Sequence, residues 1–199
     1  MIIDELTVGM VQTRCYILGR EDGEECVVID PGDEAARIEK AAGGRRIAAL
    51  LLTHGHFDHI GAAGALMKEG TRLVIHEKDA PMLKDPALNA GMLFLGKAIT
   101  APAPTDPVRE GSELDIAGLK IRVIHTPGHT PGSVCYLIDG HLFTGDTLFE
   151  YGTGRTDLPG GSEHDMAKSL RRVIPLAREY GLYPGHSGEA AWLKWNHRN

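Results

Sequence analysis

The densest group of chemically capable side chains in this chain of 199 residues lies in residues 53–59, which read T-H-G-H-F-D-H directly after an apolar run. On extended or tightly turned backbone, His54 and His56 point to the same side and can bind one metal ion. Asp58 and His59 follow the turn and can address a second ion. The spacing therefore predicts a metal centre, and the alternative is a solvated loop that is merely rich in histidine.

Three further polar side chains follow predicted strand ends, where loops over a sheet converge on a site. His129 lies in the turn T-P-G-H-T-P-G, Asp146 in T-G-D-T, and His186 in Y-P-G-H. Each of them alone could be an ordinary turn residue beside glycine and proline. Together with the first cluster they supply five imidazoles and two carboxylates, enough for two coordination shells of divalent metals. Because no thiolate is among them, the set favours zinc, with iron or manganese as alternatives.

Short strands divided by glycine and proline must position these side chains. Residues 15–18 and 26–30 are typical of a hairpin pair, and Asp33 is expected to cap a helix over about residues 33–42. Residues 47–52 are apolar on both faces, as expected of a strand covered on both sides.

Further along the chain, Ser162 opens the clearest predicted helix, with Asp165 as its capping-box partner. Its apolar stripe is predicted to consist of Met166, Leu170, Val173 and Ile174. The remaining predicted elements are a helix over 61–69 and strands at 72–75, 119–124, 133–138 and 141–144. A strand-strand-helix rhythm occurs in both halves and indicates two sheets packed face to face with helices outside. No linker divides the chain, so a single domain is expected over residues 1–199.

Composition and charge exclude several classes of protein. A hydrophobic fraction of 42% and a charged fraction of 24% are ordinary for a soluble globular domain, which excludes wholesale disorder, collagen and coiled coil. The longest aliphatic stretch, residues 47–52, is too short to cross a bilayer. A net charge of −6 without any basic run argues against nucleic-acid binding.

The cysteines and the amino terminus predict a reducing compartment. Cys15, Cys26 and Cys135 are odd in number, lack C-x-x-C spacing and sit in apolar segments, so buried free thiols are expected. Asp4 and Glu5 stand where a signal peptide would carry basic residues. The sequence therefore predicts a cytoplasmic protein.

The four motifs, in this order, resemble those of the metallo-β-lactamase superfamily, and within it those of the small glyoxalase II-like hydrolases. The resemblance runs from V-I-D-P-G at residues 28–32 to His186. It implies a four-layer αββα sandwich of two mixed sheets with outer helices. Asp30 and Thr53 match family positions that support the metal cluster from behind. The resemblance implies that the first metal is held by His54, His56 and His129 and the second by Asp58, His59 and His186, with Asp146 bridging both.

The implied activity is hydrolysis by a hydroxide that bridges two divalent ions. Two such ions roughly 3.5–4 Å apart lower the pKa of a shared water from ~15.7 to about 7, so no serine or cysteine nucleophile is required. The predicted substrate is an acyl thioester, lactoylglutathione or a related compound. Asp58 and Asp146 are predicted to orient the water and to accept its proton.

Three features depart from better-known branches of the family. True β-lactamases usually carry Cys or Ser where this chain has Asp146. Only 13 residues follow His186, and residues 154–157 (G-R-T-D) lack the Lys and Tyr that glutathione-specific glyoxalase II enzymes place there. Arg155 is predicted to contact an anionic substrate, with pairing to Asp157 as the alternative.

Two other functions stay open. Persulfide dioxygenases of the same superfamily have a segment similar to residues 154–157 and use two histidines, one aspartate and one iron. A non-catalytic metal-binding module is the third reading. A small-molecule substrate is expected, without nucleic-acid or membrane partners, and a homo-oligomer is left open.

The remaining features receive structural interpretations. The proline-broken stretch 78–107 is expected to form one short helix and a long loop, as a lid or wall over the site. His125 is expected to make a local hydrogen bond, and Trp192 and Trp195 to form a packed terminal helix face. Other histidines are taken as structural or solvated: His76, His141, His164 and His197.

Overall fold

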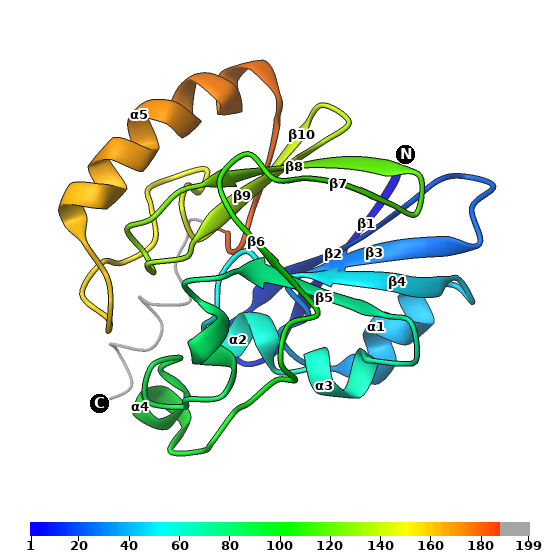
Figure 1. Ribbon diagram of the computed structural model, residues 1–199, viewed down its shortest axis with the longest axis horizontal. Helices are drawn as coiled ribbons and strands as arrows, with labels where there is room; N and C mark the ends of the chain where they lie inside the picture. The colour runs from blue at the N-terminus through cyan, green and yellow to red at the C-terminus, as the bar shows by residue number, and fades with distance from the viewer. Residues whose placement is uncertain (188–199) are drawn as a thin grey trace.

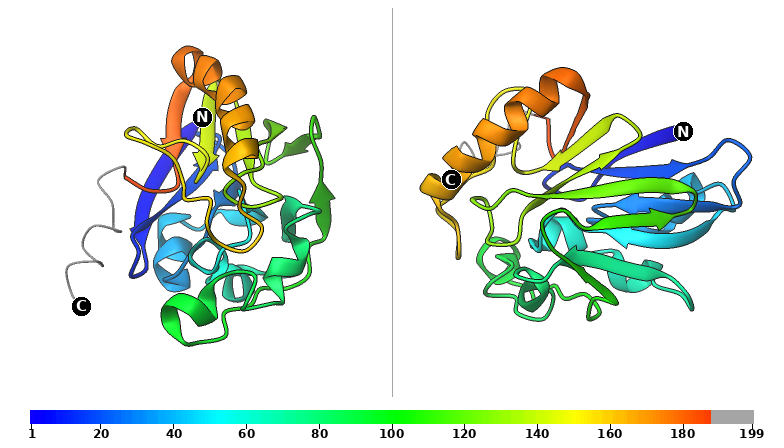
Figure 2. Two further views of the ribbon diagram at one scale, coloured as in Figure 1. Left: turned by 90° about the vertical axis from the view of Figure 1, so that its left-hand side faces the viewer. Right: turned by 45° about the horizontal axis from the view of Figure 1, so that its top comes forward.

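The protein is represented by a computed structural model, which describes residues 1–187. Its strands form two sheets stacked face to face, with helices on both outer sides (Figure 1, Figure 2). The sheets have six and five strands, in the orders β1-β2-β3-β4-β5-β6 and β11-β10-β9-β8-β7. Each sheet contains both parallel and antiparallel pairs. The predicted αββα sandwich is confirmed.

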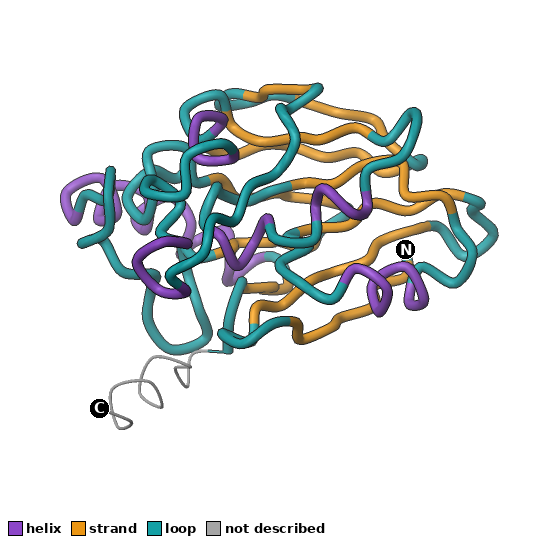
Figure 3. Tube along the Cα trace, turned by 90° about the horizontal axis from the view of Figure 1, so that it is seen from below, coloured by secondary structure: helices purple, strands orange, loops and turns teal. Residues whose placement is uncertain are grey.

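The first sheet begins as an antiparallel meander and continues as parallel strands from β3 to β6. Figure 3 shows helices lying across its outer face. The strands are β1 (Ile2–Val8), β2 (Thr13–Gly19), β3 (Glu25–Ile29), β4 (Arg46–Leu51), β5 (Arg72–His76) and β6 (Asp106–Val108), and the helices are α1 (Ala35–Ala41), α2 (Phe57–Ile60) and α3 (Ala63–Leu66).

The second sheet is antiparallel except for the parallel pair β10 and β11. The long helix α5 (Glu163–Glu179) covers its outer face, where Val173 packs against Ile124, Cys135 and Leu142. The strands are β7 (Glu113–Ile116), β8 (Leu119–His125), β9 (Val134–Ile138), β10 (His141–Gly145) and β11 (Gly181–Pro184).

The alternation of side chains along β4 accounts for the two layers of core. Leu50 packs with the helices of the outer layer, whereas Ala49 and Leu51 face the second sheet. All three are fully buried, and each buried leucine side chain contributes about 1.5–3 kcal/mol of transfer free energy. The prediction of a strand covered on both faces is confirmed, and the strand ends directly before the histidine cluster.

Two helix predictions differ from the structure. The helix predicted over 61–69 is shortened to α3, and a separate short helix, α2, precedes it. The amide of Ala62, between the two, donates to the carbonyl of Pro31 at 2.9 Å instead of continuing a helical ladder. Asp33 does not cap α1. The N-cap is Glu34, with a left-handed φ of 57° and no side-chain cap, and the Asp33 carboxylate accepts only the adjacent Glu34 amide.

The α5 prediction is confirmed at its N-cap and differs along its apolar stripe. Only half of the predicted capping box forms, because the Ser162 amide donates to the carbonyl of Gly128 rather than to Asp165. Ser162 Oγ accepts the amide of Asp165 at 3.2 Å, as a cap requires. The buried residues of the helix include Ser169, whereas Ile174 is 38% exposed. The cause is the close approach of α5 to the turn below it, where a small residue fits and the Ser169 hydroxyl donates to the carbonyl of Pro127.

The stretch 78–107 carries slightly more structure than predicted: the 3₁₀ helix η1 (Ala80–Leu83), helix α4 (Gly91–Leu95) and the first residues of β6. Strands β1, β7 and β11 were not predicted. The three cysteines are buried and free, as expected. Within the described part of the chain, no helix has both the length and the apolar character needed to cross a membrane. The predictions for Trp192, Trp195 and His197 lie outside the described residues.

Candidate metal centre

The predicted ligands meet at one end of the sandwich. The loops that follow β4 and β10 lie at this end, on the left in Figure 1. Parallel strands β3 and β4 end there, as do the parallel strands β10 and β11 of the other sheet. The loop after β4 carries the T-H-G-H-F-D-H cluster, and the β8–β9 connection carries the T-P-G-H turn. Because these ends face one another across the two sheets, residues far apart in sequence become neighbours.

The first group of ligand candidates consists of His54, His56 and His129, all buried. Nδ1 of His56 lies 2.8 Å from Nε2 of His129. The other nitrogen of His129, Nδ1, lies 2.7 Å from the carbonyl oxygen of Arg155, which places a proton on Nδ1 and leaves the Nε2 lone pair toward the centre. Burial lowers the pKa of all three histidines, so they are neutral imidazoles with lone pairs available for a cation.

The second group consists of Asp58, His59 and His186. Nε2 of His186 lies 3.2 Å, and Nε2 of His59 lies 3.3 Å, from Oδ2 of Asp58. Asp146 lies between the two groups: its Oδ2 is 3.6 Å from Nε2 of both His129 and His186. Its other oxygen, Oδ1, is 3.5 Å from Nε2 of His59. One carboxylate therefore reaches both groups.

Electrostatics differ between the two halves. Burial alone would lower the pKa of His59, but the carboxylates of Asp58, Asp30 and Asp146 raise it well above its usual value. The pKa of His186 is likewise raised, against burial, by Asp146 and Asp58. Burial would raise the pKa of Asp58, yet His59 and His186 bring it well below its usual value. This half of the centre therefore favours positive charge, which a divalent cation supplies.

Unpaired buried atoms support a fit to metal ions. Nε2 of His54 and Oδ1 of Asp146 are buried without a hydrogen-bond partner among the described residues. An unsatisfied buried polar group costs about 1–3 kcal/mol, and ligation of a cation removes this cost. Neutral imidazoles beside carboxylates suit zinc, iron or manganese. The geometry thus brings together all seven predicted ligands. Two of the groups that it forms match the predicted division, while a third joins His54 to His59 and Asp146, and the roles of all seven as ligands stay predictions.

Asp30 and Thr53 lie behind the centre, as the resemblance implies. Asp30 has a left-handed φ of 51°, and its two oxygens accept the Thr53 amide at 2.8 Å and the Thr53 hydroxyl at 2.7 Å. The same carboxylate lies 3.0 Å from Nδ1 of His59. The Thr53 hydroxyl lies 3.1 Å from Nδ1 of His54. This chain of contacts orients one histidine of each group.

Two polar residues at the site, Thr13 and Asp79, belong to none of the four sequence motifs. The hydroxyl of Thr13, at the start of β2, donates to Oδ2 of Asp58 at 2.9 Å. Asp79, which follows β5, is fully buried and contacts both histidine-bearing loops. The T-P-G-H-T-P-G turn has hydrogen-bond donors that require an acceptor, but no local pattern in the sequence identifies Asp79 as that acceptor.

The predicted substrate contact, Arg155, is engaged within the protein. Its guanidinium pairs with Asp157 at 2.5 Å and lies 5.9 Å from the centre of the Phe94 ring. The main-chain carbonyl of Arg155, rather than its side chain, holds His129. The alternative of pairing with Asp157 is therefore observed, and a substrate contact by this side chain stays a prediction.

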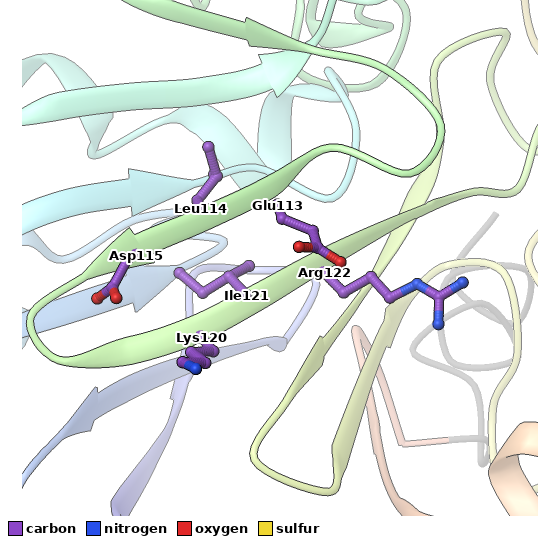
Figure 4. Close-up of a pocket in the computed structure, with 6 residues that line it drawn as sticks. All are labelled: Glu113, Leu114, Asp115, Lys120, Ile121 and Arg122. Carbon is purple, nitrogen blue, oxygen red and sulfur yellow. The ribbon is translucent and has the colours of Figure 1, made fainter.

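A hollow beside the β7–β8 hairpin lies among different residues (Figure 4). Its rim carries two cross-strand charge pairs, Glu113 with Arg122 and Asp115 with Lys120. None of the predicted site residues lines it. Its oppositely charged neighbours are typical of a solvated sheet edge.

A family model described as the metallo-β-lactamase superfamily matches residues 8–186. The chain belongs to this superfamily. Among curated relatives, hydroxyacylglutathione hydrolase GloC of Haemophilus influenzae is 34% identical over 94% of this chain and 91% of the relative.

Solved structures of three superfamily relatives share the fold. BLEG-1, described as a B3 metallo-β-lactamase, is 35% identical with a TM-score of 0.87, covering 94% of this chain and 92% of its own. TTHA1623 in a di-iron-bound form is 35% identical with a TM-score of 0.80, covering 92% of each chain. ETHE1 from Myxococcus xanthus is 31% identical with a TM-score of 0.75, covering 96% of this chain and 77% of its own. Metal-dependent hydrolysis and divalent metal binding fit these relationships, whereas the named activities differ and only the di-iron form names its metal.

Proposed function

We propose that this protein is a hydrolase of acyl thioesters that uses two divalent metal ions, with zinc favoured and iron or manganese as alternatives. The observation that carries the proposal is the position of Asp146, with one oxygen near His59 and the other near both His129 and His186. Two ions held by these groups would supply a water molecule that loses its proton near neutral pH. The proposal includes a cytoplasmic location and a small-molecule substrate, without a nucleic-acid or membrane partner.

The chain's own residues complete the chemistry. Asp58 and Asp146 are the carboxylates that can orient the attacking water and accept its proton. The Thr13 hydroxyl keeps Oδ2 of Asp58 facing the centre. Thioester hydrolysis needs no protein nucleophile under this arrangement, because the attacking group is water.

An apolar wall adjoins the centre and suits an acyl chain. Phe57, between two predicted ligands in sequence, clusters with Ala90, Leu158 and Phe94. The rings of Phe57 and Phe94 lie 5.9 Å apart. Part of this cluster comes from the stretch 78–107, and its role as a wall over the site belongs to the proposal. The name of the relative GloC adds support for a thioester.

Elemental analysis followed by an assay tests the proposal. Purified protein is expected to hold two metal ions and, when loaded with zinc, to cleave lactoylglutathione or an acyl thioester of another thiol. Asp58→Ala should lower kcat by at least about 100-fold, as expected for loss of a general base. Glu163→Gln, on the exposed first turn of α5, serves as the matched control. Equal rates in the two variants would contradict the assignment. Cleavage of a β-lactam but of no thioester would transfer the function to the activity named for BLEG-1.

A persulfide dioxygenase is the second candidate. It is favoured by the G-R-T-D segment at residues 154–157 and by a relative that binds iron. One iron per chain, with oxygen uptake on glutathione persulfide and no thioester cleavage, would establish it. Metal-loaded protein that is inert toward thioesters, lactones, phosphoesters and persulfides would instead indicate a binding module.

A further inference from the structure

Asp79 is a fully buried carboxylate outside every motif used above. It stands between β5 and η1, and the structure gives its oxygens three donors. Oδ1 accepts the amide of Gly132 at 2.6 Å. Oδ2 accepts the hydroxyl of Thr130 at 2.6 Å and the amide of Gly55 at 3.1 Å.

These donors belong to the two loops that carry the first metal group. Gly55 separates His54 from His56, while Thr130 directly follows His129. One carboxylate therefore joins the loop after β4, in the first sheet, to the β8–β9 turn of the second sheet. Among the described residues, one backbone hydrogen bond also joins these two segments. It runs from the Val134 amide to the carbonyl of Thr53.

The surroundings leave little room for adjustment. A Cβ added to Gly132 would lie 2.6 Å from Oδ1 of Asp79, and one added to Gly55 would lie 2.6 Å from Cβ of Met82. Both glycines therefore permit the loop backbones to approach the turn that Asp79 begins. Burial raises the pKa of Asp79 to about 6, against the three hydrogen bonds that stabilise its charged form.

We infer that Asp79 is a positioning residue for the first metal group: it sets the separation of His129 from His54 and His56, and thereby the affinity for the ion they hold. The inference rests on the proposed metal centre. Asp79 acts through the loops, because none of its three hydrogen-bond partners is a predicted ligand. Groups behind metal ligands typically contribute about 10- to 100-fold in metal affinity.

The test compares Asp79→Asn with the matched control Asp85→Asn in the full chain, using Zn²⁺ and a competing chromophoric chelator. Asp85 lies in the same stretch, is exposed, and accepts a backbone amide from Ala87 at 2.9 Å. Asp79→Asn places an amide donor against the Gly55 amide or the Gly132 amide. We expect this variant to bind one of the two zinc ions about 10- to 100-fold more weakly and to bind the other with nearly unchanged affinity. Asp85→Asn should bind both ions as the wild type does.

A second background identifies which ion responds. In His129→Ala, where the first group has lost a ligand, adding Asp79→Asn should not change the affinity for the remaining ion. The inference would be overturned if Asp79→Asn lowered the affinity for both zinc ions equally, or if it lowered zinc affinity further in the His129→Ala background. Either result would indicate a role in general stability. Unchanged zinc affinity in folded Asp79→Asn would overturn it as well.

Thr130→Val keeps the test decisive if Asp79→Asn does not fold. This variant removes one donor to the carboxylate and should weaken the same ion by a smaller factor, whereas unchanged zinc affinity in it would overturn the inference. Thioester turnover of the wild type is measured separately. Two bound zinc ions without hydrolysis would refute only the proposed function, and absence of zinc binding by the wild type would refute both.

Discussion

Four predicted ligands contact a polar group outside the ligand set, and these groups differ in kind; the four ligands are His54, Asp58, His59 and His129. A main-chain carbonyl holds His129, the carboxylate of Asp30 faces His59, and the hydroxyl of Thr13 donates to Asp58. Such partners fix which nitrogen or oxygen faces a metal ion. They explain why the side chains converge with defined orientation rather than as a loose cluster.

Thr13→Val tests this at the scale of one hydroxyl. Valine keeps the shape of the buried side chain and removes the donor to Asp58. The Asp58 carboxylate should then be less firmly oriented. We expect the affinity for the second zinc ion to fall by about 10-fold and thioester turnover to decrease. Chelator competition and kcat measure the two effects. Thr7→Val, at an exposed position on the neighbouring strand β1, is the control and should change neither. Thr13→Val with wild-type zinc affinity and turnover would show that the hydroxyl has no positioning role.

The sequence indicated the candidate ligands and, through the family resemblance, Asp30 and Thr53 behind them, but it did not indicate Thr13, Asp79 or the Arg155 carbonyl, for a physical reason. Metal ligands must be His, Asp, Glu or Cys, so their types and spacing are visible in a motif. A supporting group can be a backbone carbonyl or a single hydroxyl, as Arg155 and Thr13 illustrate. Asp79 was missed because it reaches two loops 24 and 53 residues away, and such long-range contacts leave no local pattern.

Among the elements, strands buried on both faces were predicted and partly exposed edges were not. β4 is apolar from Ile47 to Leu51, whereas β7 and β11 have only four residues each, too few for a period of two to be recognised. The late start of α3 also depends on tertiary structure, since the Pro31 carbonyl accepts the Ala62 amide just before this helix begins. Periodicity reports burial, so it fails where an element is short or where its hydrogen bonds go to a distant loop.

Gly128→Ala tests how α5 fixes the His129 turn. Gly128 has a φ of 144°, its carbonyl accepts the Ser162 amide at 2.8 Å, and an added Cβ would overlap the backbone of Met166. The turn must move away from α5, so we expect a loss of about 1–3 kcal/mol in unfolding free energy together with weaker zinc binding by His129. Urea unfolding and zinc competition measure the two effects.

Gly140→Ala separates crowding from backbone strain. Gly140 also has a positive φ, 78°, but an added Cβ would meet nothing within 4 Å. This control should lose stability through conformational strain alone, about 1–2 kcal/mol, and should keep its zinc affinity. If both variants bind zinc equally well, the contact between α5 and the turn does not position His129.

For the whole molecule, the two sheets contribute comparable shares of the centre. The loop after β4 supplies His54, His56, Asp58 and His59, while the second sheet supplies His129, Asp146 and His186. Between the sheets lies a continuous apolar core, which includes Tyr16 and Leu51 on one side and Tyr136 and Phe143 on the other. Cations at the open end of this core would therefore join the two sheets where apolar contacts give way to charged groups.

Metal removal should consequently lower the stability of the entire sandwich. A ligand that binds only the folded state stabilises it by about 4 kcal/mol when the free ligand concentration is 1,000 times its Kd. For a domain of this size, 1 kcal/mol corresponds to about 2–4 °C in Tm, so chelation of one such ion should lower Tm by roughly 8–16 °C. Calorimetry with and without EDTA measures the shift, and added zinc should reverse it. His129→Ala should show a smaller shift, since one ion is already weakened, while His164→Ala, exposed on α5, should behave as the wild type. If EDTA strips the metal and Tm does not move, the two sheets are held by their apolar core alone and the centre does not stabilise their packing.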